Sequence, residues 1–123
     1  MALLKKSKLN AYILANVKKL RRGWRCTRIG GYVYDRMEGE MRSLMREFVK
    51  DPIVKSESKP EGTLLVVKTV RGRLVEMLKE RYPSLDIRGI DEDAMDYLGY
   101  RLEKRLKGYI QAHPARGQTF TFG

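Results

Sequence analysis

Two long segments of the sequence each carry a single stripe of apolar residues at helical spacing, and this feature limits the folds open to the chain. The segments run from about Gly31 to Lys50 and from about Asp91 to Ala112. Their stripes consist of Val33, Met37, Met41, Leu44 and Phe48 in the first and of Met95, Leu98, Leu102, Leu106, Tyr109 and Ile110 in the second. A helix with one apolar face needs a partner, so we expect the two long helices to cross and bury each other.

Shorter elements surround the two long helices in a matching order. They are two helices over Ser7–Arg22 and Lys68–Tyr82, two extended loops over Trp24–Gly31 and Leu85–Ile90, and two short strands over Thr63–Val67 and Thr119–Phe122. A shift of 61 residues aligns Met37 with Leu98 and Asp35 with Asp96. The pattern favours an internal duplication, with repeats at 7–66 and 67–123. At 123 residues we expect a mainly α chain that forms one compact, pseudo-twofold unit over 1–123.

Positive charge is concentrated in the first quarter of the chain. The sequence has 26 Lys and Arg against 15 Asp and Glu, a formal charge of +11, and no acidic residue precedes Asp35. Such a balance favours polyanionic partners, and nucleic acid above all. The first group of candidate phosphate contacts is Lys18, Lys19, Arg21, Arg22, Arg25, Thr27 and Arg28. The second group is Arg88, Arg116, Gln118 and Thr119.

Residues that could support catalysis are isolated from one another in the sequence. Cys26 is the single cysteine and His113 the single histidine, and no phosphate-binding loop, dinucleotide glycine pattern or triad spacing is present. We therefore predict a protein that is not an enzyme, with no catalytic residue, cofactor or metal. Trp24 could stack on a base, but packing at the edge of the core is the preferred interpretation. The same holds for the tyrosines within helices, namely Tyr32, Tyr34, Tyr97, Tyr100 and Tyr109.

A short helix, a basic loop, a long helix and a second loop leading into a strand resemble the histone fold, and the archaeal and bacterial histone-like proteins most closely. In the second half, Asp86–Ala94 resembles the first loop of that family and Ala112–Thr119 the second, although Gln118 stands where the family has a lysine. In the first half, Thr27–Ile29 and Lys59–Thr63 are similar to the same loops. The resemblance implies a tandem doublet with truncated third helices, in which paired loop and strand segments lie at the ends of the molecule.

The resemblance and the charge together predict a histone-like DNA-binding architectural protein that contacts the phosphate backbone with little dependence on sequence. Double-stranded DNA is the expected partner, and a basic RNA-binding or ribosome-associated structural protein is the alternative. A subunit that binds a partner protein ranks third, and binding to a membrane surface ranks lower. We expect a cytoplasmic, nucleoid-associated protein or a component of a viral particle, present as a monomeric pseudo-dimer or a higher homo-oligomer. Arg25 and Arg28 should contribute more to binding than Arg101 and Arg105, whose helix also carries acidic residues.

Overall fold

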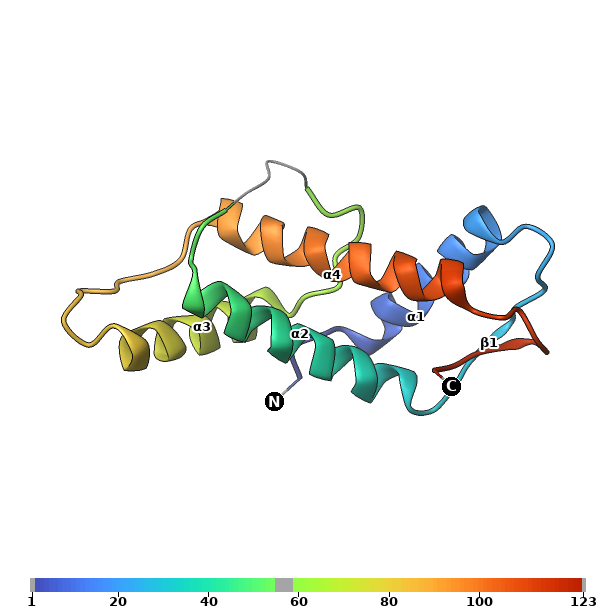
Figure 1. Cartoon of the computed structure of the whole chain (residues 1–123), viewed down its shortest axis with the longest axis horizontal. Helices are drawn as coiled ribbons and strands as arrows, with labels where there is room; N and C mark the ends of the chain where they lie inside the picture. Colours follow the sequence, from blue (N-terminus) through green and yellow to red (C-terminus); the bar gives the residue numbers. More distant parts are fainter. Residues whose placement is uncertain (1, 55–58, 123) are drawn as a thin grey trace.

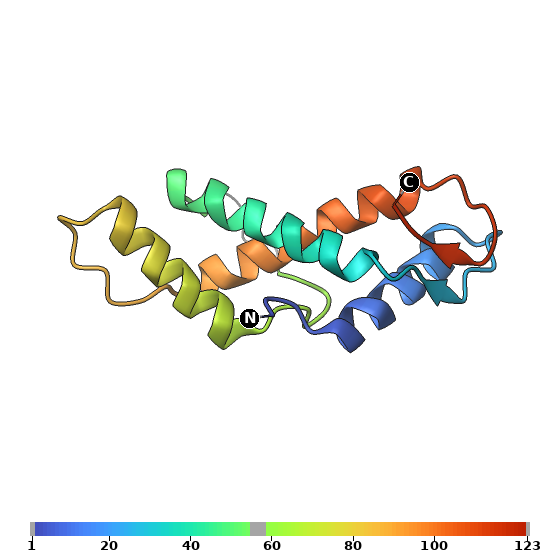
Figure 2. The same ribbon diagram turned by 90° about the horizontal axis from the view of Figure 1, so that it is seen from below.

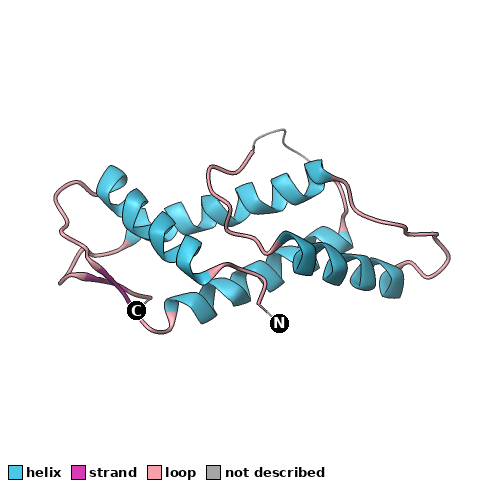
Figure 3. Ribbon diagram, turned by 180° about the vertical axis from the view of Figure 1, so that it is seen from behind, coloured by secondary structure: helices cyan, strands magenta, loops and turns pink. Residues whose placement is uncertain are grey.

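The computed structural model describes residues 2–54 and 59–122 and is built mainly from α-helices (Figure 1). The elements are α1 (Lys6–Leu20), β1 (Arg28–Ile29), α2 (Val33–Lys50), α3 (Val67–Arg81), α4 (Glu92–Ala112) and β2 (Thr119–Phe120). The four helices lie within two residues of the bounds expected from the apolar stripes, which confirms that part of the prediction. Figure 3 shows that helices make up most of the described chain and that the small sheet lies at one end.

The two long helices, α2 and α4, pack against each other and cross near the middle of an elongated molecule (Figure 2). Each is also covered by a shorter helix, since α1 packs against α4 and α3 against α2. Their apolar stripes meet in one buried cluster, in which Met37, Met41, Leu98 and Leu102 are completely inaccessible to solvent. The stripes read from the sequence are therefore the core of the fold.

The start of α4 follows from its first residues. Asp91 precedes the helix in an extended conformation, and its Oδ1 accepts a hydrogen bond from the backbone N–H of Ala94 at 3.1 Å. Glu92 and Asp93 occupy the first turn, where negative charge opposes the positive end of the helix dipole. The cap expected at Asp91 is thus confirmed.

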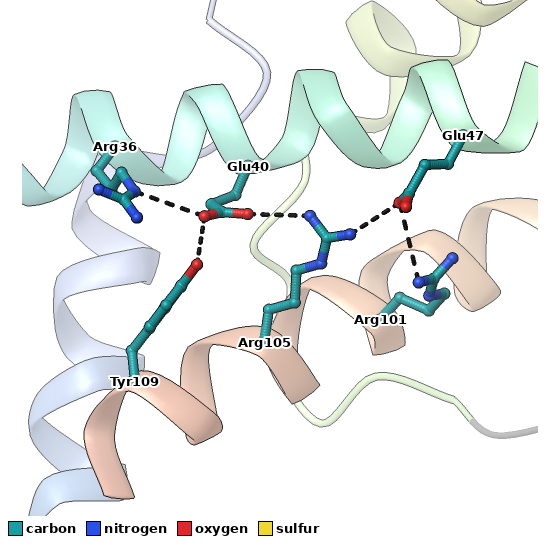
Figure 4. Close-up of polar contacts among 6 residues, drawn as sticks. All are labelled: Arg36, Glu40, Glu47, Arg101, Arg105 and Tyr109. Carbon is teal, nitrogen blue, oxygen red and sulfur yellow. Dashed lines mark hydrogen bonds and ion pairs between the residues drawn. The ribbon is translucent and has the colours of Figure 1, made fainter. Parts of the chain in front are cut away.

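A row of polar contacts joins α2 to α4 along one edge of their crossing (Figure 4). Arg105 bridges Glu40 at 2.9 Å and Glu47 at 2.8 Å, and Arg101 lies 3.9 Å from Glu47. Burial alone would raise the pKa of Glu40, but hydrogen bonds from Tyr109 and Arg105 outweigh it and lower that pKa. Arg105 therefore stabilises the packing of the two long helices, and replacing it would perturb the fold as well as the charge.

The strand expected over Thr63–Val67 was wrong. α3 already begins at Val67, and Leu65 forms only an isolated antiparallel bridge with Leu4. Loop and strand segments were expected to lie side by side at both ends of the molecule, but the loop over 85–90 projects from the end opposite β1 without a strand beside it in the described residues (Figure 1). Burial explains this arrangement. Leu4 is 1% exposed where it lies beside Leu65, whereas Asp86 and Arg88 are charged side chains that stay exposed to solvent.

Two buried carboxylates hold the segments of this bridge. Glu38 on α2 accepts hydrogen bonds from the backbone N–H groups of Leu3 and Leu4, the latter at 2.7 Å. Glu103 on α4 accepts from the N–H groups of Glu61 and Gly62 at 2.7 and 2.9 Å. Backbone donors satisfy most of the hydrogen-bonding need of these carboxylates, which makes their burial tolerable. The amino-terminal segment thereby becomes part of the fold, a role that the helical pattern does not reveal.

Candidate nucleic-acid interface

The small sheet joins two segments that lie far apart in the sequence. β1 and β2 run parallel, with Arg28 beside Thr119 and Ile29 beside Phe120. The backbone N–H groups of Thr27 and Arg28 both donate to the carbonyl oxygen of Gln118, at 2.9 and 3.0 Å. The pairing places the loop after α1 directly beside the loop after α4. Most of the first and second groups of candidate phosphate contacts therefore lie on one surface.

The aromatic rings of Trp24, His113 and Phe120 pack together next to this surface. Trp24 is 8% exposed, lies against the ring of His113 with 4.4 Å between ring centroids, and donates its indole N–H to the carbonyl of Gly117 at 2.7 Å. Phe120 is fully buried, and its ring centroid lies 5.3 Å from that of His113. Trp24 is thus a packing residue, in agreement with the preferred interpretation, and its ring is not available to stack on a base.

The guanidinium group of Arg21 forms hydrogen bonds within the protein. Its Nη1 donates to the carbonyl oxygens of Ile110, Gln111 and His113, at 2.9, 3.0 and 2.6 Å. These carbonyls lie at the end of α4 or just beyond it, where the negative end of the helix dipole attracts a cation. Arg21 therefore ties the end of α1 to the end of α4, and this structural role is separate from the phosphate contact expected of it.

Six other cations stand exposed on the same surface. They are Lys18, Lys19, Arg22, Arg25, Arg28 and Arg116. None of them forms an ion pair within 4.0 Å among residues 2–54 and 59–122, although Lys19 lies close enough to Glu61 for its charge to lower the pKa of that carboxyl. The two segments that carry them, 18–31 and 113–122, contain no acidic residue. We call the surface formed by these two segments the basic end.

No family model, curated protein or solved structure matches the chain. The described helices include none with the length and apolar character of a membrane span. In the part of the chain that the structure describes, no three His, Cys, Asp or Glu residues are grouped so that they could hold a metal ion.

Arg88 is the one candidate contact that lies elsewhere. It stands in the loop between α3 and α4, at the opposite end of the molecule from β1, and pairs with Asp86 at 2.8 Å (Figure 1). Gln118 is exposed and Thr119 half-buried, and both take part in the pairing of the basic end. The structure thus brings the other candidates together and leaves Arg88 apart.

Tyr32 is an exposed aromatic residue that the helical pattern assigned to packing, and that prediction was wrong. It precedes the first residue of α2 and is 85% exposed. It follows Gly30 and Gly31 immediately after β1, so it borders the basic end. The glycine pair before it was the available signal, because it places Tyr32 at the helix terminus, where a side chain can point into solvent.

Acidification should weaken the fold through His113. Burial, followed by the nearby charge of Arg21, lowers the pKa of His113 below its usual 6.5, and Nδ1 accepts a hydrogen bond from the N–H of Ala115 at 3.0 Å. As the pH falls, the imidazole of His113 therefore takes up a proton in the unfolded chain before it does so in the folded chain. Its contribution to the free energy of unfolding is fully present at neutral pH, and it declines once the pH falls below the pKa of His113 in the unfolded chain. The free energy of unfolding of the wild type should fall between pH 7.5 and 5.5 relative to that of His113→Gln, as measured by urea titration.

A direct titration provides the check on this prediction. The imidazole pKa from nuclear magnetic resonance should lie below 6.5, and a higher value would contradict it. Burial also raises the pKa of Glu103, which has the opposite effect on stability at acidic pH. Because Glu103 is present in both proteins, its contribution cancels in the difference.

Proposed function

We propose that this chain binds double-stranded DNA through the phosphate backbone, with the basic end as the contact surface. The observation that carries the proposal is the parallel pairing of β1 with β2, which brings two acid-free segments onto one surface. Phosphate oxygens accept hydrogen bonds from arginine, lysine, threonine and glutamine side chains, and all four types are present there. Such contacts position a duplex without reading its sequence.

The arrangement of the helices supports a histone-like architecture for this DNA-binding protein. Two long helices cross, each carries a shorter helix, and a basic loop precedes one of them. The loop after α4 pairs with the loop before α2, so each half of the chain contributes one segment to the basic end. We therefore retain the tandem doublet as a proposal, with pairing at one end of the molecule only.

The deciding experiment compares two double variants in binding to one duplex at fixed salt. Arg25→Ala with Arg28→Ala should weaken affinity roughly 30-fold, because two exposed phosphate contacts are lost from a segment that contains no acidic residue. Lys79→Ala with Arg81→Ala removes the same charge from the exposed last turn of α3, at the other end of the molecule, and should weaken affinity less than about 3-fold. Fluorescence anisotropy measures both.

Arg101 and Arg105 are unsuitable as the control pair, because their side chains hold α2 to α4. Replacing them would lower the stability of the fold as well as the charge. Thermal melting should show the two double variants to be folded. Equal losses of affinity would mean that total charge alone drives binding. A stronger affinity for a folded RNA than for the duplex would instead support the RNA-binding alternative.

A further inference from the structure

A cavity of about 380 Å³ lies between α2 and α3, and none of its lining residues belongs to the basic end. The lining combines three apolar side chains, three arginines and two other polar residues. These are Leu3, Met45 and Met77, then Arg42, Arg46 and Arg73, and finally Thr69 and Glu76. Nothing in the proposed DNA contact uses this cavity.

The floor of the cavity is apolar and anchored in the core. Leu3 is 6% exposed and Met45 1% exposed, and Met77 packs against the same cluster. Methionine side chains are flexible and polarisable, so such a floor adapts to apolar groups of different shape. A volume of this size falls within the range of ligand sites and accommodates one or two apolar side chains of a partner.

The rim is positively charged and only partly neutralised. Arg73 pairs with Glu76 at 3.2 Å, while Arg42 lies 4.0 Å from Glu38, a carboxylate that already accepts backbone hydrogen bonds. Arg46 is exposed and forms no ion pair with the described residues. Guanidinium groups bind carboxylates with two parallel hydrogen bonds. The rim therefore complements one or two carboxylates held next to an apolar group.

We propose that this cavity docks a short segment of a partner protein in which an apolar side chain is flanked by carboxylates. Nucleic acid fits it less well, because a phosphate backbone gains nothing from the apolar floor that Leu3, Met45 and Met77 form. DNA finds two segments without acidic residues at the basic end instead. The docking site thus has a different chemistry from the DNA contact and does not depend on it.

The probe is a library of blocked octapeptides that contain only Leu, Phe, Asp and Glu, screened against the full chain. The wild type should retain a subset of these peptides, and Arg46→Glu should weaken their binding at least about tenfold, since it replaces with an anion the rim cation that forms no ion pair with the described residues. Lys104→Glu makes the same change of charge at an exposed position of α4 and should alter binding less than about twofold. Arg46→Gln provides a milder variant in case Arg46→Glu does not fold.

The peptide binding of these variants either supports or overturns the docking site. Retained peptides that bind Arg46→Gln as tightly as the wild type would overturn the docking site, and so would a library from which the wild type retains nothing. If a duplex displaces the peptides and Arg46→Gln also weakens duplex binding, the cavity is a nucleic-acid surface. Peptide binding that survives Arg25→Ala with Arg28→Ala would uphold the site even if the DNA proposal failed.

Discussion

The affinity for a DNA duplex should fall roughly 10³-fold when the salt concentration rises from 50 to 200 mM. Six exposed cations of the basic end are available to phosphates, and each neutralised phosphate contributes about −0.9 to the slope of log affinity against log salt. A slope near −5 follows, because each contact releases a condensed counterion. The measurement is a series of anisotropy titrations with one duplex at several salt concentrations.

Unrelated duplex sequences serve as the control in these titrations. Their affinities should agree within about tenfold at each salt concentration, because phosphate contacts carry no direct sequence information. A slope of log affinity against log salt near −1 would show that the basic end does not contact several phosphates at once. A large spread among sequences would point to a regulator that reads bases.

Replacing Phe120 with alanine should lower the free energy of unfolding by about 3–5 kcal/mol, the usual cost of truncating a buried phenylalanine. Its ring is fully buried beneath the basic end, next to His113 and Phe122. The loss of this anchor should also loosen β2 from β1. Chemical denaturation measures the first effect, and duplex affinity at a temperature where the variant remains folded measures the second.

Phe122→Ala is the matched control, because this side chain is only half-buried and lies at the edge of the same group of rings. Phe122→Ala should lower the free energy of unfolding by less than about 1.5 kcal/mol, because the side chain of Phe122 buries less apolar surface than that of Phe120. Equal losses for the two variants would show that Phe120 does not anchor the sheet. Should Phe120→Ala fail to fold, Phe120→Leu retains most of the buried volume and tests the same contact.

The helices could be predicted because their determinants are local. A stripe such as Met37, Met41 and Leu44 repeats with the period of the α-helix, and Pro52 and Pro83 lie shortly beyond helix ends. The cap at Asp91 likewise depends on a side chain and a backbone N–H three residues apart. None of these features needs a distant partner.

The interface could be predicted only in part. Arg25, Arg28 and Arg116 stand out by charge, but the sequence presents them as two separate groups, and the hydrogen bonds between Gln118 and the loop after α1 unite them. Charge also marks Arg21, which the structure uses to cap α4. A basic residue at a helix end has the same appearance in the sequence whether it meets a phosphate or a carbonyl.

By itself, the sequence determined four amphipathic helices, a core along their stripes and a strong excess of positive charge near the amino terminus. Periodicity and composition are sufficient for these, because they depend on neighbours within a turn or two of helix. Only the tertiary structure decided that Leu4 lies beside Leu65, and that the loops around Arg28 and Arg116 share one surface. Those outcomes depend on which of several chemically similar segments buries more apolar surface and satisfies more backbone hydrogen bonds, and that competition is settled between residues far apart in the chain.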